Sequence, residues 1–132
     1  MIIGFTNNMI DFKIPDRFQV AGHPYKIVKK QFVKDDDDDA VFGLHDMISN
    51  KIYLAQEFPL GNSSYKFEDH QKMNTFWHEL FHAFNYYMNN EQDETLAQSF
   101  ANFMCEFLKT AEYDSRHERE PSLDFRPFGE EH

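Results

Sequence analysis

The segment MNTFWHELFHAF, residues 73–84 of a chain of 132 residues, carries the strongest signal for a helix. Its apolar residues recur at the three- and four-residue steps of a helix that is buried over a broad face. The pattern extends from Phe67 to about Met88 and predicts one long helix through the core. Asn89-Asn90 ends this helix, because Asn readily adopts turn and cap conformations.

A second helix is predicted from near Glu91 to about Ala111. Acidic residues at its start suit the positive end of a helix dipole. Its apolar residues continue the helical spacing through Phe107, and a short connection places it antiparallel to the first helix. The second half of the chain therefore reads as a helical hairpin.

The first half of the chain reads as short strands. Phe18–Val20 and Tyr25–Val28 flank a turn with Gly and Pro, and the second of these strands can continue to Val33. Ala40–Leu44 and Lys51–Ala55 form another pair. We expect an α+β fold in which a small antiparallel sheet of three or four strands packs on the two helices.

Composition indicates one domain at residues 1–111 and a polar C-terminal tail at residues 112–132. The net charge of −10 argues against a nucleic-acid partner, which needs a basic surface, and against an anionic membrane surface. The uninterrupted run Asp35–Asp39 is predicted to be a solvated loop, because calcium loops interleave their ligands with Gly and other residues.

Cys105 is the single cysteine, so no disulfide forms within the chain and a reducing compartment is favoured. The N-terminus shows no signal peptide, and no stretch of 18 apolar residues is present. These features predict a cytoplasmic protein. The oligomeric state stays open.

The first helix carries the string His78-Glu79-Leu80-Phe81-His82. Two His four residues apart project from one helix face, so both imidazoles can bind one metal ion at about 2.0–2.1 Å. Glu79 lies between them and can hold a water molecule without binding the metal. The structural alternative is that both His are surface or core residues and Glu79 is a solvated neighbour.

A third ligand is needed for a metal site. The metzincin pattern fails, because Asn85 and Met88 stand where it requires Gly and His. Glu94 on the second helix shares a face with Ala97 and Ala101, whose small side chains allow close helix packing. A turn at residues 89–90 places Glu94 about 4.5 Å along the helix axis from the position opposite His82. An earlier end of the first helix, or a tilted crossing of the two helices, would remove this offset.

The two His, the Glu between them and the downstream Glu-x-x-Ala-x-x-Phe-Ala of residues 94–101 resemble the ImmA/IrrE-type metallopeptidases. Small members of this gluzincin-like group are encoded by phages and mobile elements. The resemblance covers about residues 50–108 and implies a minimal zincin-like fold and an intracellular phage or bacterial protein. It implies one zinc ion per chain, bound by His78, His82 and Glu94, with Glu79 as catalytic base. Glu91 is the alternative third ligand.

The resemblance implies hydrolysis of a protein or peptide substrate, which Lys51–Ala55 could bind if that strand forms the sheet edge. The candidate groups that stabilise the oxyanion are Tyr53, His45, His117 and the pair Tyr86/Tyr87. His23 and His70 are expected to be surface residues. A second hypothesis is a zinc-stabilised, non-catalytic protein that captures a host or repressor protein.

Overall fold

A computed structural model describes residues 12–114. Lys13–Phe107, which holds most of the described residues, forms one compact unit, the first unit. This unit contains every strand and all of the helical hairpin apart from the last residues of the second helix. The expected tail beyond residue 114 lies outside the described residues. Among residues 12–114, no helix has the length and apolar character needed to cross a membrane.

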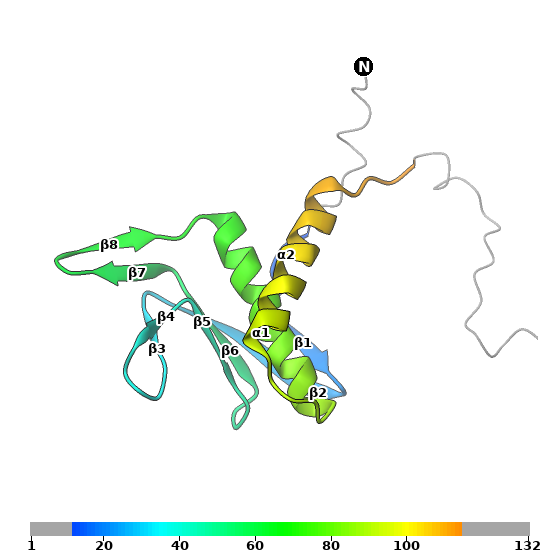
Figure 1. Ribbon diagram of the computed structural model, residues 1–132, viewed down its shortest axis with the longest axis horizontal. Helices are drawn as coiled ribbons and strands as arrows, with labels where there is room; N and C mark the ends of the chain where they lie inside the picture. The colour runs from blue at the N-terminus through cyan, green and yellow to red at the C-terminus, as the bar shows by residue number, and fades with distance from the viewer. Residues whose placement is uncertain (1–11, 115–132) are drawn as a thin grey trace, which may run out of the picture. The chain divides into compact units, whose positions relative to one another are not determined.

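The first unit has the expected α+β fold, with eight strands followed by two helices (Figure 1). The strands are, in chain order, β1 (Arg17–Val20), β2 (His23–Lys30), β3 (Val33–Lys34), β4 (Ala40–Val41), β5 (Gly43–Asp46), β6 (Lys51–Ala55), β7 (Glu57–Leu60) and β8 (Ser63–Lys66). The helices are α1 (Asp69–Tyr87) and α2 (Glu94–Thr110).

The main sheet has the order β1-β2-β6-β5. It is mixed rather than antiparallel throughout: β1 and β5 are antiparallel to their neighbours, whereas β2 and β6 run parallel. The prediction of an antiparallel sheet is therefore wrong for the β2–β6 pair. The segment between β2 and β6 first forms the β3–β4 hairpin and β5, so it is long enough for a parallel return.

Two hairpins stand beside the main sheet. The expected strand Ala40–Leu44 is divided at Phe42 into β4, which pairs with β3, and β5, which pairs with β6. The β3–β4 loop holds the aspartate run, as expected. The second hairpin, β7–β8, lies in a segment where no strand was predicted, and its turn contains Gly61 at a φ of 61°.

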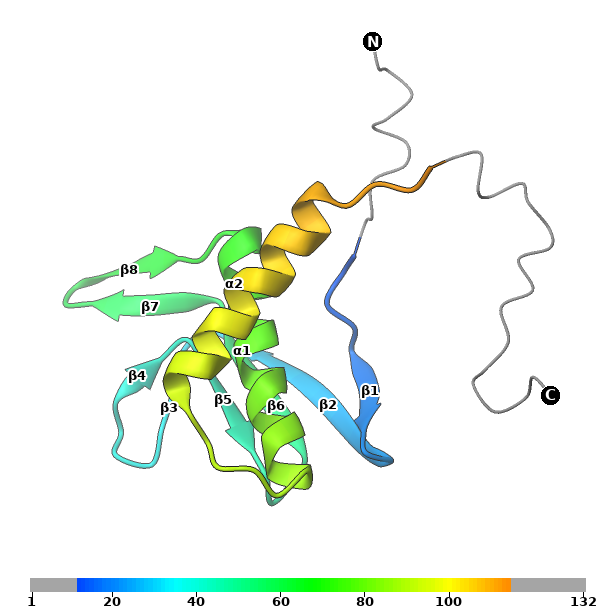
Figure 2. The same ribbon diagram turned by 45° about the vertical axis from the view of Figure 1, so that its right-hand side comes forward.

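The core lies between the main sheet and α1. On the sheet, Tyr25, Ile27, Ile52 and Leu54 are buried. On α1, Phe76 is 2% exposed, and its ring lies edge-on to that of Phe18 on β1. Figure 2 shows α1 lying against the sheet and α2 crossing the other side of α1. The sheet therefore covers one face of α1, and a different face is left for α2.

Helix α1 ends in a Schellman motif. Asn89 has a φ of 61°, its N–H donates to the Tyr86 carbonyl, and the Asn90 N–H donates to the Asn85 carbonyl. The predicted break at Asn89-Asn90 is thereby confirmed. Helix α2 starts later than expected, at Glu94, because the Asp93 side chain caps it by accepting a hydrogen bond from the Leu96 N–H at 3.0 Å.

Candidate metal centre

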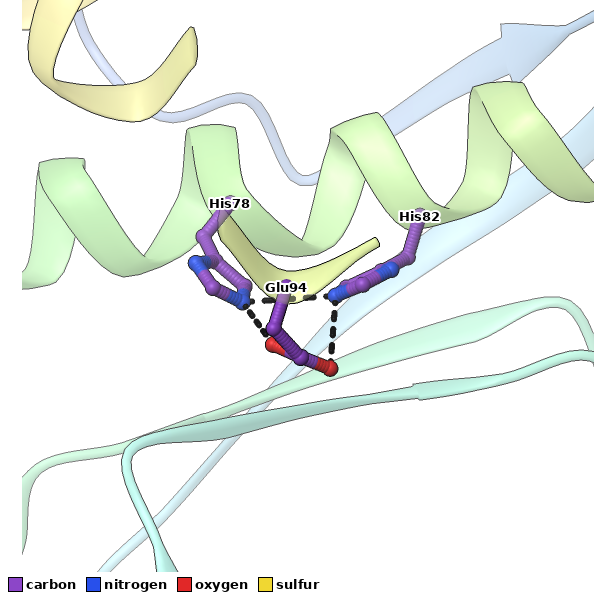
Figure 3. Close-up of side chains that lie close together, drawn as sticks. All are labelled: His78, His82 and Glu94. Atoms are coloured by element: carbon purple, nitrogen blue, oxygen red, sulfur yellow. Dashed lines mark hydrogen bonds and ion pairs between the residues drawn. The ribbon is translucent and has the colours of Figure 1, made fainter. Parts of the chain in front are cut away.

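Three side chains from the two helices converge on one point, as Figure 3 shows for His78, His82 and Glu94. The Nε2 atoms of His78 and His82 lie 3.3 Å apart. Glu94 Oε1 lies 2.9 Å from the His78 Nε2 atom, and Glu94 Oε2 lies 3.2 Å from the His82 Nε2 atom. These three residues are placed closely enough to hold a metal ion. We call them the three-residue site.

The link between the helices explains how Glu94 reaches the site. Residues 90–93 have no regular secondary structure and run back along α1 before α2 begins (Figure 2). Non-helical chain advances up to about 3.3 Å per residue, against 1.5 Å in a helix. The link thereby removes the offset that the sequence alone predicted. Glu91 is exposed and belongs to no metal-binding group among residues 12–114.

Both histidines are held through the ring nitrogen that faces away from the site. The His78 Nδ1 atom lies 3.0 Å from Gln98 Oε1, and the His82 Nδ1 atom lies 2.6 Å from Gln92 Oε1. Because an amide oxygen only accepts, each Nδ1 carries the proton. In the neutral form with its proton on Nδ1, each ring has its lone pair on Nε2, which is the form that binds a metal. Without a metal, the hydrogen bonds to the Glu94 carboxylate need a proton on Nε2 as well.

Partial burial raises the pKa of Glu94, but hydrogen bonds and charge from His78 and His82 together hold it below the ordinary value. The carboxylate is therefore ionised near neutral pH. The side chains of His78 and His82 are 17% and 10% exposed, whereas that of Glu94 is 79% exposed. The site is thus open to solvent on the α2 side.

Glu79 projects from a different face of α1, towards strand β5. It is 9% exposed, and burial raises its pKa, although the charges of His78 and His82 act in the opposite direction. A hydrogen bond from the His45 N–H also favours the ionised form. A buried carboxylate with a raised pKa beside a possible metal centre is typical of a general base.

Strand β5 approaches Glu79 closely because residue 43 is glycine. A Cβ atom on Gly43 would lie 3.2 Å from Glu79 Cγ and 2.5 Å from Thr75 Cγ2. Gly43 therefore faces α1, and the two-residue alternation of a strand places His45 on the same face. Leu44 and its cross-strand partner Tyr53 face the opposite side.

The side chains predicted as oxyanion candidates lie on different faces of the sheet. Tyr53 packs with the cluster of Val33, Ala55 and Phe67 on the far side of the sheet, away from α1. His45 lies beside Glu79, and its Nε2 atom is 2.7 Å from the Tyr25 hydroxyl.

The remaining candidates are placed as follows. The Tyr86 ring lies at 6.0 Å from that of His45, while the Tyr87 hydroxyl donates to Asn50 Oδ1 at 2.6 Å. His117 lies outside the described residues. His23 and His70 are exposed, as expected.

The strand predicted to bind substrate is not at the sheet edge. Lys51–Ala55 is β6, and it lies between β2 and β5. Its backbone groups are used on both sides, so it cannot accept an added strand. The edge next to α1 is β5, which pairs with no second strand in residues 12–114.

A second acidic group, Asp35, Asp37 and Asp39, has carboxylates near one another in the β3–β4 loop. Asp35 Oδ1 accepts hydrogen bonds from the N–H groups of Asp37 and Asp39, which accounts for the close approach. Exposed carboxylates in such a turn are held by the loop itself. The expectation of a solvated loop is consistent with this arrangement.

The chain matches no protein-family model, no curated protein and no solved structure. The resemblance to the ImmA/IrrE-type metallopeptidases stays a prediction that rests on the residues quoted for it.

Proposed function

We propose that this protein is a zinc-dependent peptidase, with His78, His82 and Glu94 as zinc ligands and Glu79 as general base. The observation that carries the proposal is the convergence of two imidazole nitrogens and a carboxylate beside a second, buried carboxylate. A site that only stabilised the fold would have no use for the second carboxylate.

The donor set and its spacing fit zinc. Zinc is bound by His nitrogen and carboxylate oxygen at about 2.0–2.2 Å, and tetrahedral geometry then separates neighbouring ligand atoms by about 3.3 Å. The distances of 2.9, 3.2 and 3.3 Å between the ligand atoms require movements of only a few tenths of an ångström. Three protein ligands leave one position for water, as in catalytic zinc sites.

When bound, zinc would supply a Lewis acid that activates water and polarises a substrate carbonyl. Glu79 would remove a proton from the attacking water and transfer it to the leaving nitrogen. Burial makes the Glu79 carboxylate a stronger base, while the His45 N–H holds it in place.

The free edge of β5 is the favoured position for an extended peptide. The Ala55 N–H donates to the Phe42 carbonyl at 2.9 Å, so Phe42 and Ala55 form a hydrogen-bonded pair. In an antiparallel ladder such pairs alternate, so Gly43 and His45 direct their backbone groups away from β6. The His45 N–H is bonded to Glu79, so a substrate strand would pair with the other backbone groups of this edge. A substrate strand that paired there would pass directly beside Glu79.

Zinc analysis and one substitution test the proposal. Metal analysis of the purified protein should find one zinc per chain, and His78→Ala should lose it. Glu79→Gln should keep the zinc but abolish cleavage of a peptide mixture followed by mass spectrometry. Absence of zinc from protein supplied with the metal would refute the proposal.

The cleavage assay of wild type separates this proposal from the second hypothesis, a zinc-stabilised binding protein. In that case wild type and Glu79→Gln would both retain zinc, and wild type itself would cleave no peptide in the mixture.

A further inference from the structure

Gln92, in the link before α2, contacts His82 at two points. Its Oε1 atom lies 2.6 Å from the His82 Nδ1 atom, and its amide nitrogen donates to the His82 backbone carbonyl at 3.0 Å. A backbone carbonyl can only accept, so the amide NH₂ group must face it and the amide oxygen must face the ring. Gln92 therefore fixes both the ring orientation and the tautomer of His82.

Gln98 has the same relation to His78 from one turn inside α2. Its Oε1 atom lies 3.0 Å from the His78 Nδ1 atom. Its amide nitrogen donates to Asn74 Oδ1 at 2.8 Å and to Asn102 Oδ1 at 3.0 Å. The Asn74 amide donates in turn to Asn102 Oδ1, so the orientation of Gln98 is set by a network across both helices.

Few side chains of α2 are buried. Its fully buried side chains are Ala97 and Ala101, and Phe100 contacts the rings of Trp77 and Phe81. In contrast, Leu96, Phe103 and Phe107 are 55%, 61% and 48% exposed. The polar contacts to the two histidines are thus a large part of what holds the start of α2.

We propose that Gln92 and Gln98 are positioning residues for the metal, and that metal binding and the docking of α2 are linked. This inference rests on the proposed function. Each glutamine keeps the Nε2 lone pair of its histidine directed at the site, and each belongs to the segment that also supplies Glu94. Linkage is reciprocal: what weakens the docking of α2 weakens metal binding, and bound metal stabilises α2.

The test measures zinc affinity by competition with a colorimetric chelator. Gln92→Leu and Gln98→Leu should each weaken zinc binding by about 10- to 100-fold, the usual effect of losing a partner of a metal-bound histidine. Gln98→Glu retains an acceptor for the ring N–H and should restore most of the affinity. Zinc should also slow amide hydrogen exchange in residues 94–101, and less so in Gln98→Leu.

Asn102→Ala is the matched control. It removes hydrogen bonds from the same helix contact but touches neither histidine, and Asn74 Oδ1 still orients the Gln98 amide. It should therefore weaken zinc binding clearly less than Gln98→Leu does. An equal loss in Asn102→Ala and Gln98→Leu would reduce Gln98 to a helix-packing residue and overturn its positioning role.

The remaining outcomes are also decisive. Folded Leu variants that bind zinc as tightly as wild type overturn the inference and leave the zinc site intact, whereas a wild type without zinc overturns both. If the Leu variants do not fold, NMR of zinc-loaded wild type tests the inference instead. The Nδ1–H protons of His78 and His82 should exchange slowly with solvent, because each is hydrogen-bonded to a glutamine. Fast exchange of both protons would overturn the inference.

Discussion

Gly43 and Glu79 are in such close contact that a Cβ atom on Gly43 would stand 3.2 Å from Glu79 Cγ. This contact joins the free edge of the sheet to the face of α1 that carries Glu79. A glycine is required here by space alone, because the backbone of β5 passes directly over Thr75 and Glu79.

Gly43→Ala is expected to lower the free energy of unfolding by about 1–3 kcal/mol, the usual cost of an added methyl group in a packed interior. Its closest contact would be Thr75 Cγ2, at 2.5 Å. Thr75→Ser removes that methyl group, so it should recover part of the loss when combined with Gly43→Ala. Urea unfolding of the four proteins of this double-mutant cycle gives the coupling. Additive effects would contradict the assigned contact.

Glu94→Gln should reduce the stabilisation by zinc, because it removes a charged ligand from the three-residue site. At free zinc of 100 times the dissociation constant, binding stabilises the fold by about 2.7 kcal/mol, and a tenfold weaker affinity removes about 1.3 kcal/mol of this. Thermal unfolding with and without zinc measures the difference. Glu91→Gln is the matched control, and an equal effect in both variants would reject Glu94 as the ligand.

The metal-free protein should lose stability as the pH falls below about 6.5, partly through His45. Burial lowers the pKa of His45, as does the charge of His82, while Asp46 acts in the opposite direction. The unfolded chain thus binds a proton at His45 at a pH where the folded chain does not. The contribution of His45 to stability is complete above the pKa that His45 has in the unfolded chain. It is lost as the pH falls from there towards the lower pKa that His45 has in the folded chain.

His45→Gln should therefore flatten the dependence of the free energy of unfolding on pH between 6.5 and 5, by up to about 1.4 kcal/mol per pH unit for one proton. Urea unfolding in the presence of a chelator measures it. Tyr25→Phe removes the hydroxyl bound to His45 but keeps the titrating ring, so it should lower stability and retain most of the slope. An unchanged slope in His45→Gln would contradict the prediction.

The turn between β1 and β2 offers a stabilising substitution. Ala21 and Gly22 have φ values of 51° and 83°, the left-handed conformations of a type I′ hairpin turn. An alanine side chain is strained there, and Asn tolerates it better. Ala21→Asn should raise the free energy of unfolding by about 0.5–1 kcal/mol in thermal or urea unfolding. Ala21→Val should lower it, because a β-branched residue is least suited to positive φ.

Local features of the sequence predicted α1 and the positions of His78, Glu79 and His82 on it. A four-residue spacing on a helix brings two side chains together whatever the rest of the fold does. The break at Asn89-Asn90 was likewise local, since a left-handed residue at a helix end depends on the neighbouring carbonyl groups. Gln98 could have been found in the same way, because it lies one turn after Glu94. Gln92 lies in an irregular link and gives no periodic signal.

Two features depend on the tertiary structure alone. They are the pairing partner of each strand and the position of Glu94 along α1 relative to the two histidines. The parallel pairing of β2 with β6 joins segments far apart in the chain, and it moved the free edge from Lys51–Ala55 to β5. The extended link of residues 90–93 returned Glu94 to the histidines, which helix geometry alone did not predict. Spacing along a helix is a local property of the chain, whereas strand order and the course of a link depend on how distant segments pack.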